Sequence, residues 1–235
     1  NKILAKKAKK ICVAYPGMEK FFPADKIQYT GNPVRKDILH LDGKKEKAFR
    51  HFGLEEGKKV LLVLGGSLGA RTINQAVLAD MEGLEKEGYQ VLWQSGKFYF
   101  SEMSEKVKAS GLKHIHVLEF IREMDLAYAA ADVVVSRAGA LSVSELSLVG
   151  KPVVFIPSPN VAEDHQTKNA MAYVSRQAAL LLRDAEAVGK LKSTVDPLFA
   201  DPSIGVALAY NMYKNAKPDS TEALINEHEK HVKRK

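Results

Sequence analysis

The sequence predicts an α/β fold, with a parallel β-sheet covered by helices on both faces, and three observations support this prediction. From residue 60 onward, short apolar runs alternate with longer segments in which apolar residues recur at helical spacing. The apolar runs are hydrophobic at nearly every position, as strands buried on both faces are. The first run, VLLVL (60–64), leads directly into the glycine-rich turn GGSLGA (65–70), which joins it to a helical segment.

The individual elements follow from this alternation. Strands are expected at 60–64, 89–93, 114–118, 132–136, 152–156 and 178–182. The intervening segments predict helices at 70–87, 98–110, 123–131, 141–149 and 163–177. Three further helices are expected at 184–199, 203–214 and 219–233, because Asp201-Pro202-Ser203 and Lys217-Pro218-Asp219-Ser220 supply stop and cap signals between them.

Residues 1–34 follow a different pattern. A basic helical piece precedes two short apolar runs at 11–15 and 26–30, which we expect to be strands of another sheet. The charged stretch that follows predicts only a short helix near 44–52.

Composition places the chain among soluble globular proteins, with 46% hydrophobic and 27% charged residues in 235. Its single cysteine, Cys12, cannot form an internal disulfide, which favours a reducing, cytosolic setting. No apolar run approaches the roughly 18 residues needed to span a bilayer. The first residue is Asn1 rather than Met, so we expect a processed product or a piece of a longer protein.

The net charge of +7 favours anionic partners such as phosphates, nucleic acid or an acidic membrane surface. Lysines crowd the first ten positions: Lys2, Lys6, Lys7, Lys9 and Lys10. They form either a solvated helix face or a surface for anionic lipid or a partner domain.

The unusual residues of the sequence fall in the loops that follow the expected strands. These loops are GGSLGAR (65–71), QSGK (94–97), EFIREM (119–124), SRAGALSVSE (136–145) and SPNVAEDHQ (158–166). In a parallel sheet all such loops emerge at the carboxyl edge, where ligands bind. We therefore expect them to converge on one pocket.

The first of these loops suits a phosphate or diphosphate. Its glycines permit close approach of a ligand to the backbone, Ser67 adds a hydroxyl, and a helix amino terminus follows. A tight turn without a ligand is the alternative. The spacing is not G-x-G-x-x-G, and no acidic residue ends the second strand, which disfavours a dinucleotide site.

Two other loops carry side chains suited to sugars. Glu145 can accept two hydrogen bonds from a ribose diol, although Ser142 and Glu145 also have the spacing of a capping box. Gln166 can both donate hydrogen bonds to a polyhydroxyl ligand and accept them from it. His165 beside it can also contact such a ligand, but the simpler interpretation is that it is a surface residue without a ligand. No cluster of residues shows metal-ligand spacing, so no metal and no cofactor is predicted.

Six motifs occur together and in order: GNPVR (31–35), GGSLGA (65–70), QSGK (94–97), EFI (119–121), SRAGALSVSE (136–145) and DHQTKNA (164–170). With this set the chain resembles the MurG family of N-acetylglucosaminyltransferases, which convert lipid I to lipid II in bacterial peptidoglycan synthesis. The resemblance implies a Rossmann-like domain that forms one half of a GT-B glycosyltransferase. It implies three parts: 1–34 as the end of the acceptor domain and a connector, 35–216 as the UDP-sugar domain, and 217–235 as a helix packing back towards the acceptor domain.

The resemblance also implies roles for individual residues. Ile121 would contact the uracil through its backbone, and Glu145 would hold the ribose hydroxyls. His165 and Gln166 would read the sugar, and Arg35 would add a cation near the phosphates. The diphosphate would be bound by two loops, comprising Gly66, Ser67, Gly69, Ala140, Leu141, Ser142, Val143 and Ser144. Leu68 stands where many family members carry Gln, so a polar contact to the donor is missing.

The expected partners are UDP-N-acetylglucosamine, lipid I and the anionic cytoplasmic face of the inner membrane, with no nucleic acid. No catalytic residue is assigned, because the glycine-rich acceptor loop of the family and its histidine have no counterpart here. The alternatives are an enzyme resembling UDP-N-acetylglucosamine 2-epimerase, for which Glu163 and Asp164 are the available carboxylates, and a non-catalytic nucleotide-binding module.

Overall fold

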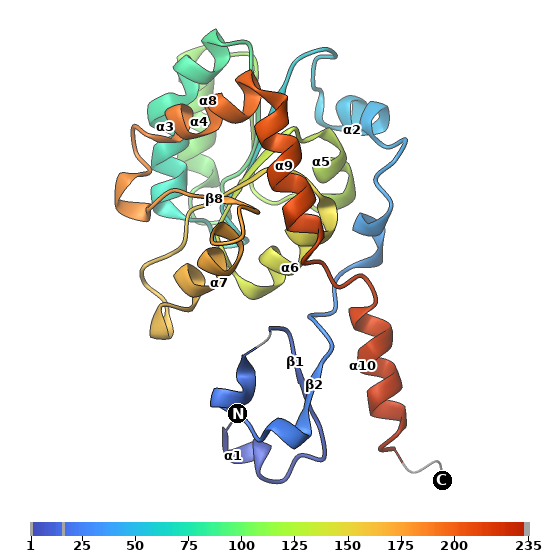
Figure 1. Ribbon diagram of the computed structural model, residues 1–235. Helices are drawn as coiled ribbons and strands as arrows, with labels where there is room; N and C mark the ends of the chain where they lie inside the picture. The colour runs from blue at the N-terminus through green and yellow to red at the C-terminus, as the bar shows by residue number, and fades with distance from the viewer. Residues whose placement is uncertain (1, 16, 233–235) are drawn as a thin grey trace.

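The computed structural model describes residues 2–15 and 17–232 of the chain. Within these residues, six parallel strands form the central sheet in the order β5-β4-β3-β6-β7-β8. This sheet lies among the helices in the upper part of Figure 1. The strands are β3 (Val60–Leu64), β4 (Gln90–Gln94), β5 (Ile115–Leu118), β6 (Val133–Ser136), β7 (Val153–Phe155) and β8 (Leu180–Leu181). Every strand overlaps a segment predicted from the sequence, and only β4 extends beyond its segment, by one residue at Gln94, so the α/β fold class is confirmed.

The strand order reverses once. The chain starts at β3 in the middle of the sheet, runs outward through β4 to β5, and then returns to place β6 on the other side of β3. This is the Rossmann-like order, and in such sheets ligands bind in the crevice expected where the order reverses, which here is at the carboxyl ends of β3 and β6.

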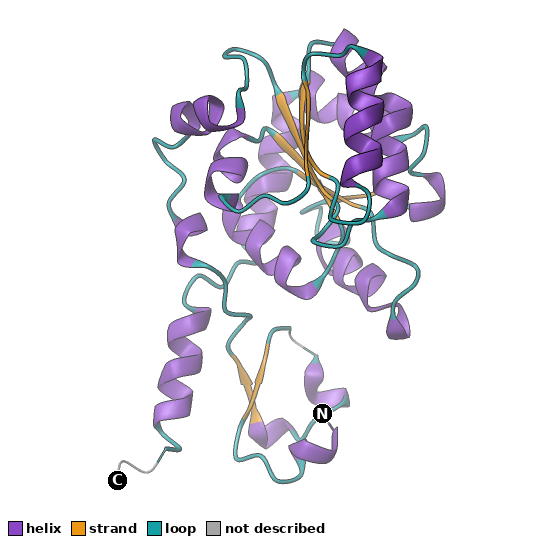
Figure 2. Ribbon diagram, turned by 180° about the vertical axis from the view of Figure 1, so that it is seen from behind, coloured by secondary structure: helices purple, strands orange, loops and turns teal. Residues whose placement is uncertain are grey.

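Helices cover both faces of the sheet (Figure 2). One core lies beneath α3, α4 and α8, and the other lies beneath α2, α5, α6 and α7. The helix that follows β3 therefore lies on the opposite face from the helix that follows β6. The bounds are α2 (Lys45–Phe52), α3 (Arg71–Lys86), α4 (Phe100–Ser110), α5 (Met124–Ala130), α6 (Ala140–Val149), α7 (His165–Val174), α8 (Leu191–Ala200) and α9 (Pro202–Tyr213).

Three predicted helices are shorter than expected. The helix expected over 219–233 covers only Ser220–Glu229, and residue 233 lies outside the described residues. The continuous helix over 184–199 is wrong: a 3-10 turn, η5 (Asp184–Glu186), is separated from α8 by Gly189, whose φ of +81° does not fit a right-handed helix. The helix expected from residue 163 begins only at His165, because Glu163 and Asp164 adopt φ values of 57° and 52° after the turn η4 (Ala162–Asp164). Asp201 does cap α9, accepting a bond from the Ser203 N–H at 2.9 Å.

The amino-terminal residues form a separate small unit, called here the β1–β2 unit (residues 2–15 and 17–29). Strands β1 (Ile11–Val13) and β2 (Ile27–Tyr29) pair in parallel, next to α1 (Lys2–Ala5), η1 (Met18–Lys20) and η2 (Ala24–Lys26). The last helix, α10 (Ser220–Glu229), lies beside this unit rather than on the main sheet (Figures 1 and 2). Between the unit and the sheet the chain passes through η3 (Lys36–Leu39).

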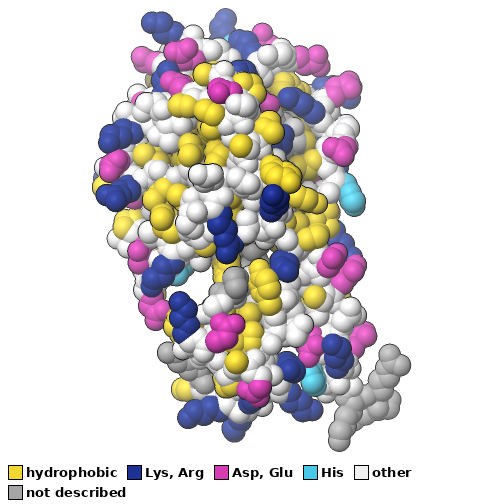
Figure 3. All heavy atoms as spheres, in the orientation of Figure 1, with side chains coloured by type: hydrophobic (Ala, Val, Ile, Leu, Met, Phe, Trp, Pro, Cys, Tyr) yellow, Lys and Arg dark blue, Asp and Glu magenta, His cyan; other side chains and the backbone are white. Residues whose placement is uncertain are grey.

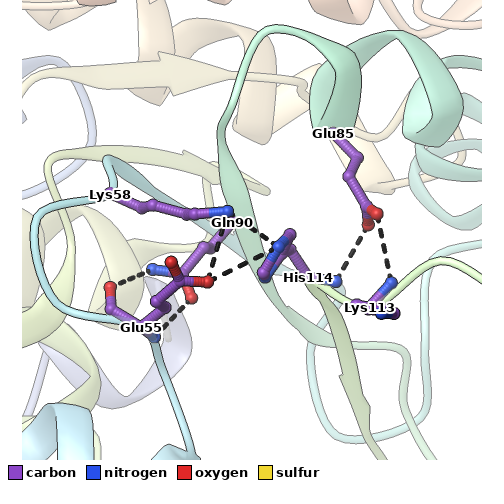
Figure 4. A network of polar contacts seen from close by, with 6 residues as sticks. All are labelled: Glu55, Lys58, Glu85, Gln90, Lys113 and His114. Atoms are coloured by element: carbon purple, nitrogen blue, oxygen red, sulfur yellow. Dashed lines mark hydrogen bonds and ion pairs between the residues drawn. The ribbon is translucent and has the colours of Figure 1, made fainter.

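The amino edge of the sheet is closed by a polar network (Figure 4). The buried amide of Gln90 exchanges two hydrogen bonds with the backbone of Glu55, at 2.7 and 2.9 Å. The Glu85 carboxylate accepts the backbone N–H groups of Lys113 and His114, at 3.2 and 2.8 Å. These groups satisfy one another, so the network is structural and the chemistry must be sought at the opposite edge.

None of the helices in the described ranges is both long and apolar enough to cross a membrane.

Candidate functional site

The carboxyl edge of the sheet brings the predicted loops together. Leu64, the last residue of β3, pairs with Gln94 on one side and with Ser136 on the other. The loops that begin at residues 65, 95 and 137 therefore start side by side, and the loops after β5 and β7 flank them.

Two of the glycines in the first loop are explained by packing against the second loop. A Cβ on Gly65 would lie 2.8 Å from the carbonyl oxygen of Gln94, and a Cβ on Gly69 would overlap the ring of Tyr99. Gly96, from the second loop, packs directly on the backbone of Gly69. The tight-turn alternative thus accounts for Gly65 and Gly69.

Gly66 has no such explanation. Its φ is +80°, and a Cβ there would meet nothing within 4 Å. Gly66 and Ser67 are both exposed at the edge of the sheet. This part of the loop is open to a ligand, and the packing of the chain gives no reason for its small residues.

Two helix amino termini flank the crevice between β3 and β6. Helix α3 begins after Ala70 and α6 begins after Gly139; neither has a side-chain cap or an acidic residue in its first turn. Their first N–H groups and the positive ends of their dipoles are therefore available to an anion. A diphosphate is the chemical group that this pair of termini suits.

Glu145 lies on α6 and is held from two sides. The Arg35 Nε donates to Oε1 at 3.1 Å, and the Tyr128 hydroxyl donates to Oε2 at 3.3 Å. The capping-box alternative for Ser142 and Glu145 is wrong. The residue at the N-cap position of α6 is Gly139 rather than Ser142, and no side chain caps the helix. Each carboxylate oxygen keeps a lone pair for a further donor.

Tyr128 remains a donor at neutral pH. Its burial raises the pKa of the hydroxyl, and the adjacent Glu145 carboxylate raises that pKa further. The hydroxyl is therefore protonated, and it orients the Glu145 carboxylate, whose side chain is 17% exposed. Sequence reasoning missed Tyr128, because nothing in its local pattern marks it.

The GNPVR segment docks onto the start of α6. Besides the Arg35 contact, the Asn32 amide donates to the Ser144 hydroxyl at 3.1 Å, and Ser144 donates to the Ala140 carbonyl at 3.0 Å. The Tyr15 hydroxyl donates to the same carbonyl at 3.3 Å, and burial raises the pKa of Tyr15 to about 12. The connector is thus fixed to the helix that carries Glu145.

The other expected contact residues divide into backbone and side-chain candidates. The side chains of Ile121 and Val143 are 2% and 0% exposed and belong to the core, so only their backbone can meet a ligand. The Ile121 N–H donates to the Gln94 side chain at 2.9 Å, so the backbone carbonyl of Ile121 is the group that can contact a ligand. Leu141 is exposed, and Ser142 is half-buried.

The loop after β7 presents Gln166 and His165. Gln166 Oε1 accepts a hydrogen bond from the Ser158 N–H at 3.0 Å. The loop therefore orients the side-chain amide, and its NH₂ group can donate to a ligand. His165 is exposed, and its Nδ1 lies 2.9 Å from the Ala162 carbonyl.

A further polar cluster ties the same edge together behind the crevice. Arg137 forms an ion pair with Asp184 and donates to the Ile156 carbonyl at 2.9 Å. Thr72, in the first turn of α3, donates to Asp184 at 2.9 Å. The cluster joins the ends of β6, β7 and β8 to the start of α3, and nothing in the local pattern around Asp184 marks this residue.

Replacing Asp184 by alanine is expected to lower the free energy of unfolding by about 1–2 kcal/mol, because Arg137 loses its counter-charge and Thr72 its acceptor. This is less than for a fully buried pair, because both charged side chains keep 17% exposure. Urea denaturation measures the effect. The exposed pair of Glu102 and Lys106 provides the control, since Glu102→Ala should change stability by less than about 0.5 kcal/mol. Equal losses in the two variants contradict this account of the cluster.

Within residues 2–15 and 17–232, no group of three or more His, Cys, Asp or Glu side chains is arranged to hold a metal ion.

Comparison with known proteins gives a consistent result. Residues 60–227 match the family model described as the glycosyltransferase family 28 C-terminal domain. A relative from Flavobacterium psychrophilum, named UDP-N-acetylglucosamine--N-acetylmuramyl-(pentapeptide) pyrophosphoryl-undecaprenol N-acetylglucosamine transferase, is 49% identical over 97% of this chain. The chain covers only 61% of the length of that relative.

Solved structures agree on the fold. The crystal structure of Acinetobacter baumannii MurG has a TM-score of 0.74 and 26% identity, covering 97% of this chain and 62% of that one. UDP-GlcNAc 2-epimerase from Neisseria meningitidis, solved bound to UDP-GlcNAc, has a TM-score of 0.67 and 15% identity, covering 98% and 63%. At that identity the second likeness shows the fold alone. The predicted resemblance to the MurG family and to the GT-B fold is confirmed.

Proposed function

This chain belongs to the glycosyltransferase family 28 C-terminal domain, and on that basis we propose that it is the donor-binding part of a lipid II-forming N-acetylglucosaminyltransferase. The donor is UDP-N-acetylglucosamine and the acceptor is lipid I. The observation that carries the proposal lies at the carboxyl ends of β3 and β6, where two uncapped helix amino termini stand next to an oriented carboxylate.

The proposed binding mode assigns each part of UDP to one loop. The uracil lies against the backbone at residues 119–121, and the ribose diol donates to Glu145. The diphosphate lies between Gly66 and Ser67 on one side and residues 140–144 on the other, with Arg35 nearby. Gln166 and His165 face the sugar hydroxyls. These assignments rest on the open loop at Gly66 and on the free capacity of Glu145 and Gln166.

The proposed transfer inverts the anomeric centre. The acceptor hydroxyl attacks the anomeric carbon as the bond from that carbon to the diphosphate oxygen breaks, and UDP leaves with the electron pair. Negative charge then grows on the diphosphate, where fixed N–H groups and a nearby guanidinium lower the barrier most. The amino termini of α3 and α6 and Arg35 supply those groups. The residue that takes the proton from the acceptor hydroxyl is not assigned to this chain. We therefore expect the chain to bind the donor without turnover.

The surface that meets the membrane and its lipid acceptor lies at the other end of the molecule, in the β1–β2 unit. Ile3 and Leu4 are 83% and 71% exposed, and Lys6, Lys7, Lys9 and Lys10 follow them in sequence. Exposed apolar side chains among lysines suit an anionic bilayer surface. We place this corner of the β1–β2 unit at the cytoplasmic face of the inner membrane.

A 2-epimerase is the rival activity. It needs a carboxylate near C2 of the sugar, and Glu163 and Asp164 are exposed in the loop before α7. Curated relatives near 50% identity that are named as transferases favour transfer over epimerisation.

Calorimetric titration tests the proposal. The chain is expected to bind UDP and UDP-N-acetylglucosamine more tightly than ADP or NAD, because its curated relatives are named as transferases of N-acetylglucosamine from UDP-N-acetylglucosamine. A preference for either adenine nucleotide would refute the assignment. Release of a free epimer from UDP-N-acetylglucosamine by the whole protein favours the rival.

A further inference from the structure

A cavity of about 950 Å³ lies between the β1–β2 unit and the main domain. Its walls come from Tyr15 and from residues 17–29 of the unit, from α7 and the turn before it, and from the connector between α9 and α10. It borders the proposed donor site at His165 and at Tyr15, whose hydroxyl donates to the Ala140 carbonyl. Its volume is within the range of small-molecule sites.

The charge of this cavity is strongly one-sided. Among the residues that the structure describes, five cationic side chains and one carboxylate line it: Lys20, Lys168, Arg176, Lys214 and Lys217 against Glu163. Within the described ranges, none of the five forms an ion pair with a carboxylate. Basic side chains at the junction of the two units are visible on the face shown in Figure 3.

Neutral groups hold four of these cations. Lys168 donates to the backbone carbonyl of Glu163 at 2.5 Å. Arg176 donates to the Asn215 side chain at 2.6 Å, and the Lys217 and Lys214 ammonium groups lie 4.4 and 4.3 Å from the ring centres of Tyr29 and Tyr210. Such contacts position a cation without neutralising it. Lys20 makes neither a hydrogen bond nor an ion pair with the described residues. By contrast, Arg35, Lys44 and Arg137 elsewhere in the chain each face a carboxylate.

The two tyrosines of the lining add no negative charge. Burial raises the pKa of both Tyr15 and Tyr173, so their hydroxyls stay protonated at neutral pH, and the Tyr15 hydroxyl donates to the Ala140 carbonyl. At the rim, Glu163 and Asp164 hold φ values of 57° and 52°, a conformation that non-glycine residues rarely adopt. Rare backbone conformations of this kind concentrate at binding sites.

We propose that this cavity is a second anion-binding site, separate from the nucleotide crevice, for a phosphate-class group that carries at least two negative charges. Several lysines and an arginine around one space bind such a group through charge-assisted hydrogen bonds. The group can belong to a soluble diphosphate or to a lipid headgroup. The site does not depend on the proposed transferase activity.

The test uses inorganic pyrophosphate as the probe, titrated into the chain already saturated with UDP, so that the nucleotide crevice is filled. We expect pyrophosphate to bind, and the double variant Lys20→Ala, Lys217→Ala to weaken it roughly tenfold or more. The control is Lys86→Ala, Lys106→Ala, which removes two exposed lysines from α3 and α4 and the same net charge. Circular dichroism checks that all variants fold.

Vesicle flotation distinguishes the source of the anion. Binding to phosphatidylglycerol vesicles, but not to phosphatidylcholine vesicles, that is lost in the Lys20, Lys217 variant and kept in the control assigns the site to a lipid headgroup. Binding of pyrophosphate without that loss assigns it to a soluble group. If wild type binds neither probe, or if both double variants weaken binding equally, the proposal is overturned. A titration with UDP alone, run beforehand, tests the donor site. If UDP does not bind, the proposal for the donor site fails by itself. The pyrophosphate titration, which tests the second site, is then run without UDP.

Discussion

Replacing Glu145 by alanine should weaken UDP binding by roughly 1–3 kcal/mol, or about 5- to 150-fold in Kd, because two hydrogen bonds to the ribose diol are lost. The geometry explains why the effect should be large. Arg35 and the buried Tyr128 hold the carboxylate in place before any ligand arrives, so little ordering is needed on binding. Isothermal titration of wild type and variant with UDP measures the difference.

A deoxynucleotide makes this prediction specific. If Glu145 binds the ribose, wild type should prefer UDP to 2′-deoxy-UDP, and Glu145→Ala should lose that preference. Tyr128→Phe is the matched control: it keeps the carboxylate, so it should keep the preference even if overall affinity falls. An unchanged preference in Glu145→Ala removes Glu145 from the ribose site, whatever happens to total affinity.

Replacing Gly96 by alanine should lower the free energy of unfolding by roughly 3 kcal/mol, since overpacking and a left-handed φ both oppose the new side chain. The Cβ would overlap the backbone of Gly69, and Gly96 has a φ of +83°. Neither loop can retreat easily, because the Lys97 N–H is bonded to the Ser67 carbonyl at 3.0 Å. Chemical denaturation checks the prediction.

Gly66→Ala is the matched comparison. Its φ is similarly positive but its surroundings are empty, so the loss of stability should be only about 1 kcal/mol. If the loop binds a diphosphate, Gly66→Ala should nevertheless weaken UDP binding in a protein that remains folded. Equal destabilisation by the two substitutions contradicts the division between packing glycines and a ligand-facing glycine.

The fold was predictable because its strands are buried on both faces. Runs such as VLLVL at 60–64 have no polar face, and only a covered parallel sheet accommodates several of them. Helix ends were less predictable where the chain leaves the common backbone regions. Glu163, Asp164 and Gly189 break expected helices through left-handed φ values, and at the first two positions neither residue type signals this.

The site was predictable only as a set of loops. Parallel topology forces the loops to one edge, so Gly66, Glu145 and Gln166 could be assigned to it from strand positions alone. The partners that orient them depend on tertiary contacts across about 17 to 110 positions of sequence, as with Tyr128 and Arg35 on Glu145. A capping-box spacing at Ser142 and Glu145 suggested a local role, which the distant contacts replace.

The central claim is that one crevice between the amino termini of α3 and α6 receives the nucleotide. A crystal structure of the chain with UDP tests this most directly. We predict the diphosphate between Gly66 and Ala140, with the ribose hydroxyls at hydrogen-bonding distance from Glu145. Density for UDP at the amino edge of the sheet, or along the outer side of β5, would contradict the account.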